Sequence, residues 1–112
     1  MARRESKKYK ALYFDLRIKD LAEHYSKTNP KGAYSQISRF LTKRNFSHAQ
    51  YSGYHSNYKT TDLEIFDLIH EMSQELPWLH KCVNHFEVTN IGTNYDLMDL
   101  FIEQIEEPIE LQ

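Results

Sequence analysis

The chain contains few of the residues that mark secreted, membrane-bound or metal-rich proteins. Its 112 residues include one cysteine, Cys82, and a single thiol cannot close a disulfide within the chain. No apolar run approaches the roughly 20 residues that cross a bilayer, and residues 1–10 lack the apolar core of a signal peptide. We therefore expect a cytoplasmic protein that does not enter a membrane.

Glycine and proline are also scarce, with three residues of each. The chain has no Gly-rich loop of the kind that cradles phosphates, no helix-turn-helix pattern and no Ser-His-Asp order. With 40% hydrophobic and 27% charged residues, the composition is that of an ordinary globular domain. We predict one domain at residues 9–105, between a flexible basic extension at 1–8 and an acidic tail at 106–112.

The net charge of −2 hides an uneven distribution along the chain. Residues 1–59 contain 13 Lys and Arg against 4 Asp and Glu, whereas residues 60–112 contain 1 Lys against 12 Asp and Glu. The two balances, +9 and −11, add to −2. This asymmetry is typical of a basic surface that meets a polyanion, although the two halves could also neutralise each other within the fold.

Residues 9–18 alternate with the period of a β-strand, and this strand has two different faces. One face is apolar and contains Leu12, Phe14, Leu16 and Ile18. The other face is mixed and contains Tyr13, Arg17 and a single acid, Asp15. The sequence therefore predicts a strand that buries one face and leaves a lone carboxylate on the other.

Helical and strand periods alternate along the rest of the chain. Asn45 is of a type that tolerates a left-handed helix cap, and Thr61 with Glu64 matches a capping box at a helix start. The predicted elements are an irregular stretch with a helical turn at 19–29, a helix at 30–45, one or two strands at 46–58 joined at Ser52 and Gly53, a helix at 61–76, a strand at 82–91 and a helix at 94–105.

This order predicts an α+β protein with the ferredoxin-like βαββαβ arrangement and an additional C-terminal helix. Two helices would cover one face of the sheet, and the chain would leave the other face uncovered. An open, half-apolar face on a small domain is typical of a two-fold interface. We therefore expect a homodimer that pairs through the face carrying Tyr13 and Asp15.

Asp15 is the first candidate for chemistry, because a carboxylate is costly to bury alone. If two copies meet across a two-fold axis, two Asp15 side chains approach each other. Such a pair could hold Mg²⁺, which would orient a phosphate and activate water. The alternative is an acid paired with Arg17 or with a tyrosine hydroxyl, with no chemical role.

His48 and His55 lie in a tyrosine-rich segment together with Ser52 and Tyr54. RNA carries its own nucleophile, the 2′-OH, so a metal-free ribonuclease needs a base, an acid and a cation that stabilises phosphate. Histidine can serve as base or acid near neutral pH. Tyrosines such as Tyr13 could stack on unpaired bases, or they are core and interface residues.

His80, Cys82 and His85 do not predict a zinc site. Their spacing does not match a common structural site, and a fourth ligand is not evident. In a strand, Cys82 and His85 would also point to opposite faces.

Five segments in order resemble the virulence-associated protein D family. They read KALYFDLRI, GAYSQISRFLTKRNF, QYSGYHSNY, LEIFDLIHEMSQELPWL and VNHFEVTNI, and a predicted helix follows the last. The resemblance covers roughly residues 9–105. The resemblance implies a ferredoxin-like homodimer, similar in fold to the small nuclease-like subunit of CRISPR adaptation complexes. It also implies endoribonuclease activity on mRNA, with the chain as the toxin of a toxin–antitoxin pair.

The resemblance also implies roles for individual residues. Asp15 matches the acid that meets its symmetry mate in the fold relative, and Arg17 stands where the family has a basic residue. Gln50, Ser52 and Tyr54 match a Q-x-S-x-Tyr segment. The chain departs from the family in the extension at 1–8 and in Gly53, which stands where a β-branched residue is common.

Together, these features predict a homodimeric endoribonuclease that cleaves single-stranded RNA and has an antitoxin protein as partner. Asp15 would position Mg²⁺ or water, Ser52 and Tyr54 would bind the scissile phosphate, and Arg17 would stabilise negative charge. The predicted substrate contacts are Tyr13, Gln50, His48 and His55. The alternatives are a non-catalytic dimeric module that binds an antitoxin or a nucleoprotein complex, and a DNA-directed nuclease.

Overall fold

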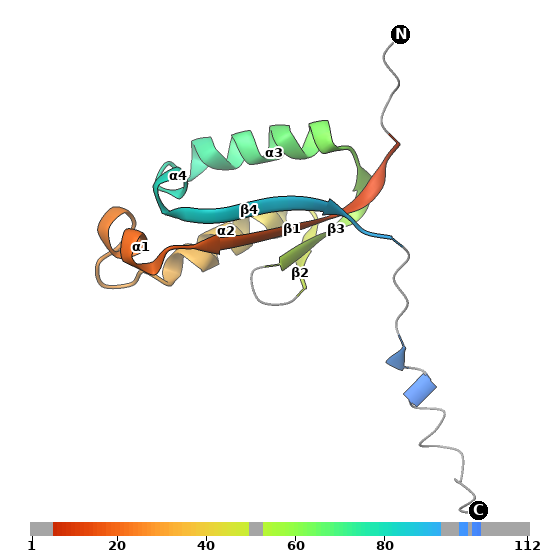
Figure 1. Cartoon of the computed structure of the whole chain (residues 1–112), viewed down its shortest axis with the longest axis horizontal. Helices are drawn as coiled ribbons and strands as arrows, with labels where there is room; N and C mark the ends of the chain where they lie inside the picture. Colours follow the sequence, from red (N-terminus) through yellow and green to blue (C-terminus); the bar gives the residue numbers. More distant parts are fainter. Residues whose placement is uncertain (1–5, 50–52, 93–96, 99, 102–112) are drawn as a thin grey trace, which may run out of the picture.

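A computed structural model of the chain describes residues 6–49, 53–92, 97–98 and 100–101. Within these ranges the chain forms four strands and four helices (Figure 1). The strands are β1 (Lys8–Leu16), β2 (Phe46–His48), β3 (Gly53–Thr60) and β4 (Val83–Asn90), and the helices are α1 (Ile18–His24), α2 (Gly32–Lys43), α3 (Asp62–Glu75) and α4 (Leu79–Cys82).

The four strands form one sheet in the order β2-β3-β1-β4. Each neighbouring pair is antiparallel. The predicted α+β class is therefore confirmed, and the strand order is compatible with the ferredoxin-like fold. β1 and β3 are the inner strands, so residues of β1 have a neighbour on both sides.

β1 alternates between two environments, as its sequence predicts. Leu12, Phe14 and Leu16 are at most 5% exposed, whereas Tyr13 and Asp15 are exposed. The predicted end of the strand was wrong, because the strand stops at Leu16 and Ile18 begins α1 with 46% of its surface exposed.

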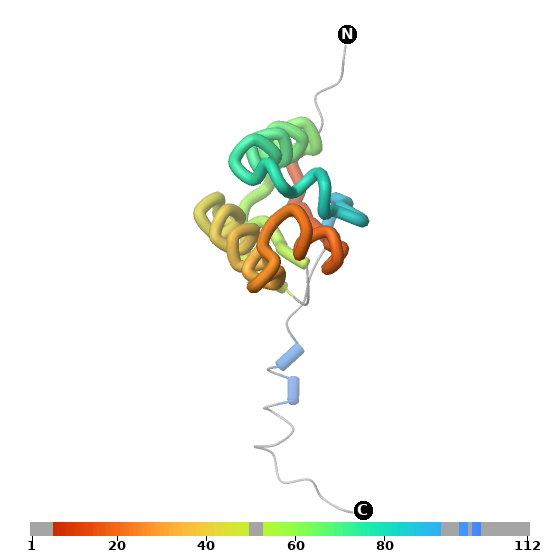
Figure 2. The backbone as a smooth tube through the Cα atoms, turned by 90° about the vertical axis from the view of Figure 1, so that its left-hand side faces the viewer, coloured from red at the N-terminus to blue at the C-terminus, as the bar shows by residue number. Residues whose placement is uncertain are grey.

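The two long helices lie on one side of the sheet (Figure 2). They form one core with the apolar side of β1, because burying apolar surface is the main favourable contribution to folding. The buried residues of this core from α2 and α3 are Ala33, Ile37, Phe40, Leu41, Ile65, Leu68 and Met72.

The opposite side of the sheet is not covered by α2 or α3, and we call it the open face. Cross-strand partners in a sheet share a face, so the register with β1 identifies the open-face residues of β3 and β4. The open face contains Tyr9, Ala11, Tyr13 and Asp15 of β1, His55 and Lys59 of β3, and His85, Glu87 and Thr89 of β4.

Most predicted element ends agree with the structure. Asn45 follows α2 with a left-handed φ of 62°, and the Thr61 hydroxyl accepts a hydrogen bond from the Glu64 backbone N–H at 3.2 Å. α1 is a correction to the irregular stretch predicted at 19–29, where local apolar periodicity was too short to show a full helix.

The predicted helix at 94–105 falls mostly outside the described residues, although Met98, Leu100 and Phe101 are helical. The tail at 106–112 and most of the extension at 1–8 also lie outside them. Within the described part of the chain, no helix combines the length and apolar character needed to cross a membrane.

Lys10 carries a charge into the core side of the sheet, with none of its surface exposed. Its ammonium donates to Asp62 at 2.7 Å and to the side-chain oxygen of Asn90. Asp62 is the first residue of α3 and Asn90 is the last residue of β4. This contact therefore ties the middle of the sheet to the start of α3.

We expect Asp62→Asn to lower the free energy of unfolding by about 3 kcal/mol, because it removes the carboxylate that balances a buried ammonium. Urea denaturation measures this loss. Asp67→Asn removes an exposed acid from the same helix and should change stability by less than about 0.5 kcal/mol. Equal effects of the two substitutions would contradict a stabilising role for the Lys10 contact.

Candidate functional site

Asp15 lies on the open face, near the end of β1, and its side chain is exposed. Its carboxylate accepts a hydrogen bond from the Asn84 side-chain amide at 3.1 Å. Directly across the ladder, Asp15 is paired with His85 of β4. Directly opposed residues of antiparallel strands have Cβ atoms about 4.5–5.5 Å apart, so this register places a carboxylate beside an imidazole.

A fourth polar residue completes this group. The His85 ring nitrogen Nε2 lies 3.3 Å from a Glu87 carboxylate oxygen, and Glu87 is paired with Tyr13. The ladder shifts register between Asp15 and Leu16, which leaves Asn84 as an extra residue on β4. Bulges of this kind redirect side chains. We call Asp15, Asn84, His85 and Glu87 the Asp15 cluster.

The charge of Asp15 reaches the neighbouring helix. Burial raises the pKa of Tyr34, and the Asp15 carboxylate raises it further. Tyr34 belongs to α2 and stacks on Phe14, with ring centroids 6.2 Å apart. The negative charge of Asp15 therefore acts on Tyr34 and disfavours ionisation of its hydroxyl.

Arg17 and Tyr13 both lie close to Asp15 in the chain but differ in their contacts. Tyr13 is 38% exposed on the open face. The guanidinium of Arg17 donates to the Asp20 carboxylate and, at 3.3 Å, to the Lys81 backbone carbonyl. Among the described residues, Asp15 is hydrogen-bonded to Asn84 and not to Arg17, so the alternative of an Asp15–Arg17 pair is not observed.

Tyr54 is not brought together with Asp15. It is paired with Leu12 across the ladder, is 5% exposed, and stacks on Phe14 at 6.0 Å. These contacts place its ring on the helix-covered side of the sheet, opposite to the Asp15 cluster.

The remaining predicted site residues are dispersed. The His48 ring lies 4.9 Å from that of Tyr54, on the edge strand β2. His55 is on the open face, opposite Ala11 and several residues along the sheet from Asp15. Gln50 and Ser52 lie outside the described residues, so their predicted roles stay predictions.

A metal ion needs several acidic or histidine side chains whose ligand atoms lie close together. Mg²⁺ is held mainly by oxygen ligands in octahedral geometry. Among the described residues, Asp20, Glu23 and His24 are the acidic and histidine group whose ligand atoms fall within 4.8 Å of one another. Asp15 is not in this group, so the Mg²⁺ site predicted at Asp15 stays a prediction.

Cys82 lies at the end of α4 and packs into the core. Its side chain is fully buried in the core, and burial is the main factor that raises the pKa of its thiol. Since the thiolate is the metal ligand and the nucleophile, Cys82 is suited to packing.

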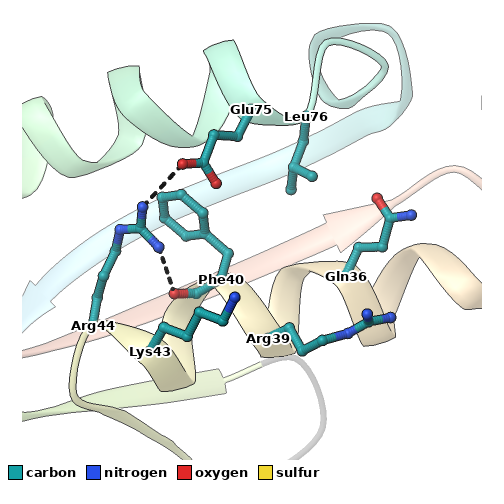
Figure 3. A pocket seen from close by; sticks show the side chains of 7 residues that line it. All are labelled: Gln36, Arg39, Phe40, Lys43, Arg44, Glu75 and Leu76. Atoms are coloured by element: carbon teal, nitrogen blue, oxygen red, sulfur yellow. Dashed lines mark hydrogen bonds and ion pairs between the residues drawn. The ribbon is translucent and has the colours of Figure 1, made fainter.

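A cavity of about 210 Å³ lies between α2 and α3, on the helical side of the molecule (Figure 3). Its cations are Arg39, Lys43 and Arg44. The Arg44 guanidinium donates to the Phe40 carbonyl and to Glu75, both at 3.1 Å, and also to Glu71. Arg44 is therefore a clamp between the two helices, while Arg39 and Lys43 form a basic patch outside the open face.

Sequence reasoning missed Asn84, His85 and Glu87 as partners of Asp15. The pattern of β4 contained part of the signal, because Phe86 and Val88 alternate with His85 and Glu87. Assigning His85 to the face of Asp15 also required the β1–β4 pairing, which no local pattern specifies.

No protein-family model matches this chain, and neither does any curated protein. Membership in the virulence-associated protein D family therefore stays a prediction.

The Arg44 clamp generates a pH-dependent contribution to stability. The hydrogen bond from Arg44 holds the pKa of the Glu71 carboxyl below its ordinary value of 4.5. The folded protein then binds this proton less tightly than the unfolded chain, so the contribution is present above pH 4.5 and is lost as the pH falls through the lower pKa of the folded state.

We expect the urea midpoint to fall less between pH 7 and pH 3 in Glu71→Gln than in the unmodified protein, because glutamine has no proton to bind. Asp67→Asn, without a described ion pair, should keep the original pH dependence. A Glu71→Gln protein that loses stability as steeply as the unmodified one would contradict the Arg44 assignment.

Proposed function

We propose that this chain is an endoribonuclease that cleaves single-stranded RNA at the Asp15 cluster. The observation that carries the proposal is the direct opposition of Asp15 and His85 across β1 and β4, on the open face. A carboxylate and an imidazole at this separation can act as the base and the acid of one proton-transfer reaction. Exposure gives a polymeric substrate access to both.

The proposed reaction uses the 2′-OH of RNA as its nucleophile. The Asp15 carboxylate removes the 2′-OH proton as that oxygen forms a bond to the adjacent phosphorus. The bond from phosphorus to the 5′-oxygen of the next nucleotide breaks, and protonated His85 gives its proton to this oxygen. The products are a 2′,3′-cyclic phosphate and a free 5′-OH, so atoms and charge balance.

Glu87 and Arg17 have supporting roles in this proposal. The Glu87 carboxylate, 3.3 Å from His85, acts as a positioning residue that orients the imidazole. Arg17 has five N–H donors, of which the contacts with Asp20 and Lys81 use two, so the others can face a phosphate. The antitoxin that the resemblance implies would be a protein that covers the open face.

We expect Asp15→Asn and His85→Gln each to lower the rate of RNA cleavage about 100-fold or more, since positioned acids and bases contribute about 10²–10⁴-fold. Cleavage of a labelled oligoribonucleotide by purified protein measures the rate. The matched controls are Asp67→Asn and His80→Gln, which change exposed residues outside the cluster and should leave the rate unchanged. Full activity in both Asp15 and His85 variants would remove the cluster from the mechanism.

The second candidate function is a non-catalytic dimeric interaction module, and a different surface favours it. Leu63 and Phe66 of α3 are 67% and 58% exposed. Phe66 borders an apolar cavity of about 290 Å³ between α3 and the edge strand β4. β4 has one neighbour in the described sheet, so a second copy of this chain could extend the sheet there and cover both side chains.

In that arrangement, the double variant Leu63→Ser/Phe66→Ser should convert a dimer into a monomer at micromolar concentration, as measured by light scattering after gel filtration. Ile18→Ser, which alters an exposed apolar residue of α1, serves as the control and should leave the dimer intact. A monomeric unmodified protein would contradict this candidate. If Tyr13→Ser dissociates the dimer and the α3 double variant does not, the two copies pair through the open face.

A further inference from the structure

A second feature lies about six residues away from Asp15 along β1. A groove of about 1100 Å³ lies where β1 begins, and its lining comes from β1, β2, β3 and the end of β4. Its charged residues are Lys7, Lys8 and Lys59, and its rings are Tyr9 and His55. None of the described residues that line it is a carboxylate. We call this feature the lysine groove.

The cations of the lysine groove are available to a ligand. Lys7, Lys8 and Lys59 are exposed, and none of them forms an ion pair with a described carboxylate. The Lys59 ammonium lies 5.8 Å from the centre of the Tyr9 ring. Tyr9 is 43% exposed, so part of its ring is open to solvent beside a positive charge.

A local irregularity in the sheet shapes the groove. Between the Tyr9 and Ala11 pairings, three residues of β3 oppose Lys10 alone. The Ser56 hydroxyl fills this gap, because it accepts from the Lys10 backbone N–H at 2.9 Å and donates to the Tyr58 carbonyl at 2.7 Å. The Lys10 backbone N–H thus has a partner where the regular pairing is interrupted, as at bulges beside functional sites.

We propose that the lysine groove binds single-stranded RNA and guides it along β1 to the Asp15 cluster. Exposed aromatic rings stack on unpaired bases, and cationic side chains follow the phosphate backbone. In a duplex the base faces are already stacked and hidden from Tyr9, so the groove selects single strands. A base on Tyr9 brings its phosphates to Lys8 and Lys59.

The distance along the sheet fits one continuous ligand. Tyr9 and Asp15 are six residues apart on one strand and face the same side, which corresponds to roughly 20 Å at about 3.3 Å per residue. One extended RNA strand can therefore contact the groove and the cluster together. This inference rests on the proposed function in taking RNA as the ligand, but binding can be measured separately from cleavage.

The test measures binding of a fluorescent 12-nucleotide oligouridylate by anisotropy, using Asp15→Asn protein so that the RNA stays intact. Lys8→Gln/Lys59→Gln should weaken binding at least about 10-fold. It should also reduce the slope of log affinity against log salt by about 1.4, since each phosphate contact of a single strand contributes about 0.7. Tyr9→Leu should weaken binding about 10-fold through lost stacking, and Tyr9→Phe should restore it.

The matched control is Arg39→Gln/Lys43→Gln, which removes two exposed cations from the helical side and should leave binding unchanged. An equal loss of RNA affinity in this control would overturn the proposed groove. Unchanged RNA binding by Tyr9→Leu would also overturn it, and so would polyglutamate that competes with the labelled RNA as well as unlabelled RNA does. Thermal melting of each variant is the folding control. A Tm within a few degrees of that of the unmodified protein shows that the variant is folded.

The two proposals fail in different ways. RNA that is bound in the groove but never cleaved would refute the endoribonuclease and support the groove. RNA that is cleaved at the Asp15 cluster while the groove variants bind normally would refute the groove alone.

Discussion

The register of β1 is the constraint on which the rest of the structure depends. Leu12 and Phe14 point toward the helices and are nearly inaccessible, so Tyr13 and Asp15 must point the other way. Because side chains alternate with a period of two, a slip of one residue would expose the apolar set and move Asp15 under the helices. Lys10, bonded to Asp62 and Asn90 on the helix side, adds a polar anchor to the same register.

Much of the fold could be predicted from local patterns. The alternation in β1, the left-handed residue at Asn45 and the Thr61 cap each reflect interactions within a few residues of one another, so the sequence shows them directly. The short helices α1 and α4 are different, since each buries only one or two side chains. Their stability comes from contacts between distant segments, such as the backbone hydrogen bond from Arg17 to Cys82 at 2.8 Å.

The candidate site was predictable only in part, for the same reason. Asp15 could be assigned to the uncovered face from β1 alone. Placing His85 beside Asp15 also requires the β1–β4 pairing. The sequence does not distinguish Tyr54 from the neighbouring tyrosines, and only the β1–β3 register shows that it lies in the core. The lysine groove depends on an irregular pairing in which three residues of β3 oppose one residue of β1. No pattern in the sequence of either strand predicts this pairing.

The uneven charge along the sequence has a partial counterpart in space. Lys7, Lys8 and Lys59 from the basic half of the chain line one groove where β1 begins, while His85 and Glu87 from the acidic half lie beside Asp15 at the other end of β1. Other opposite charges neutralise each other within the fold, as Arg44 does with Glu71 and Glu75. The opposite charges of the two halves are therefore partly separated in space and partly paired within the fold.

The central claim is that the open face performs RNA cleavage through the 2′-OH. The most direct measurement is mass spectrometry of the products formed by purified protein from an oligoribonucleotide and from the all-deoxy oligonucleotide of matching sequence. We predict fragments that end in 2′,3′-cyclic phosphate from the RNA and an intact deoxy strand. Cleavage of both strands to linear phosphates, or of neither, would contradict the account.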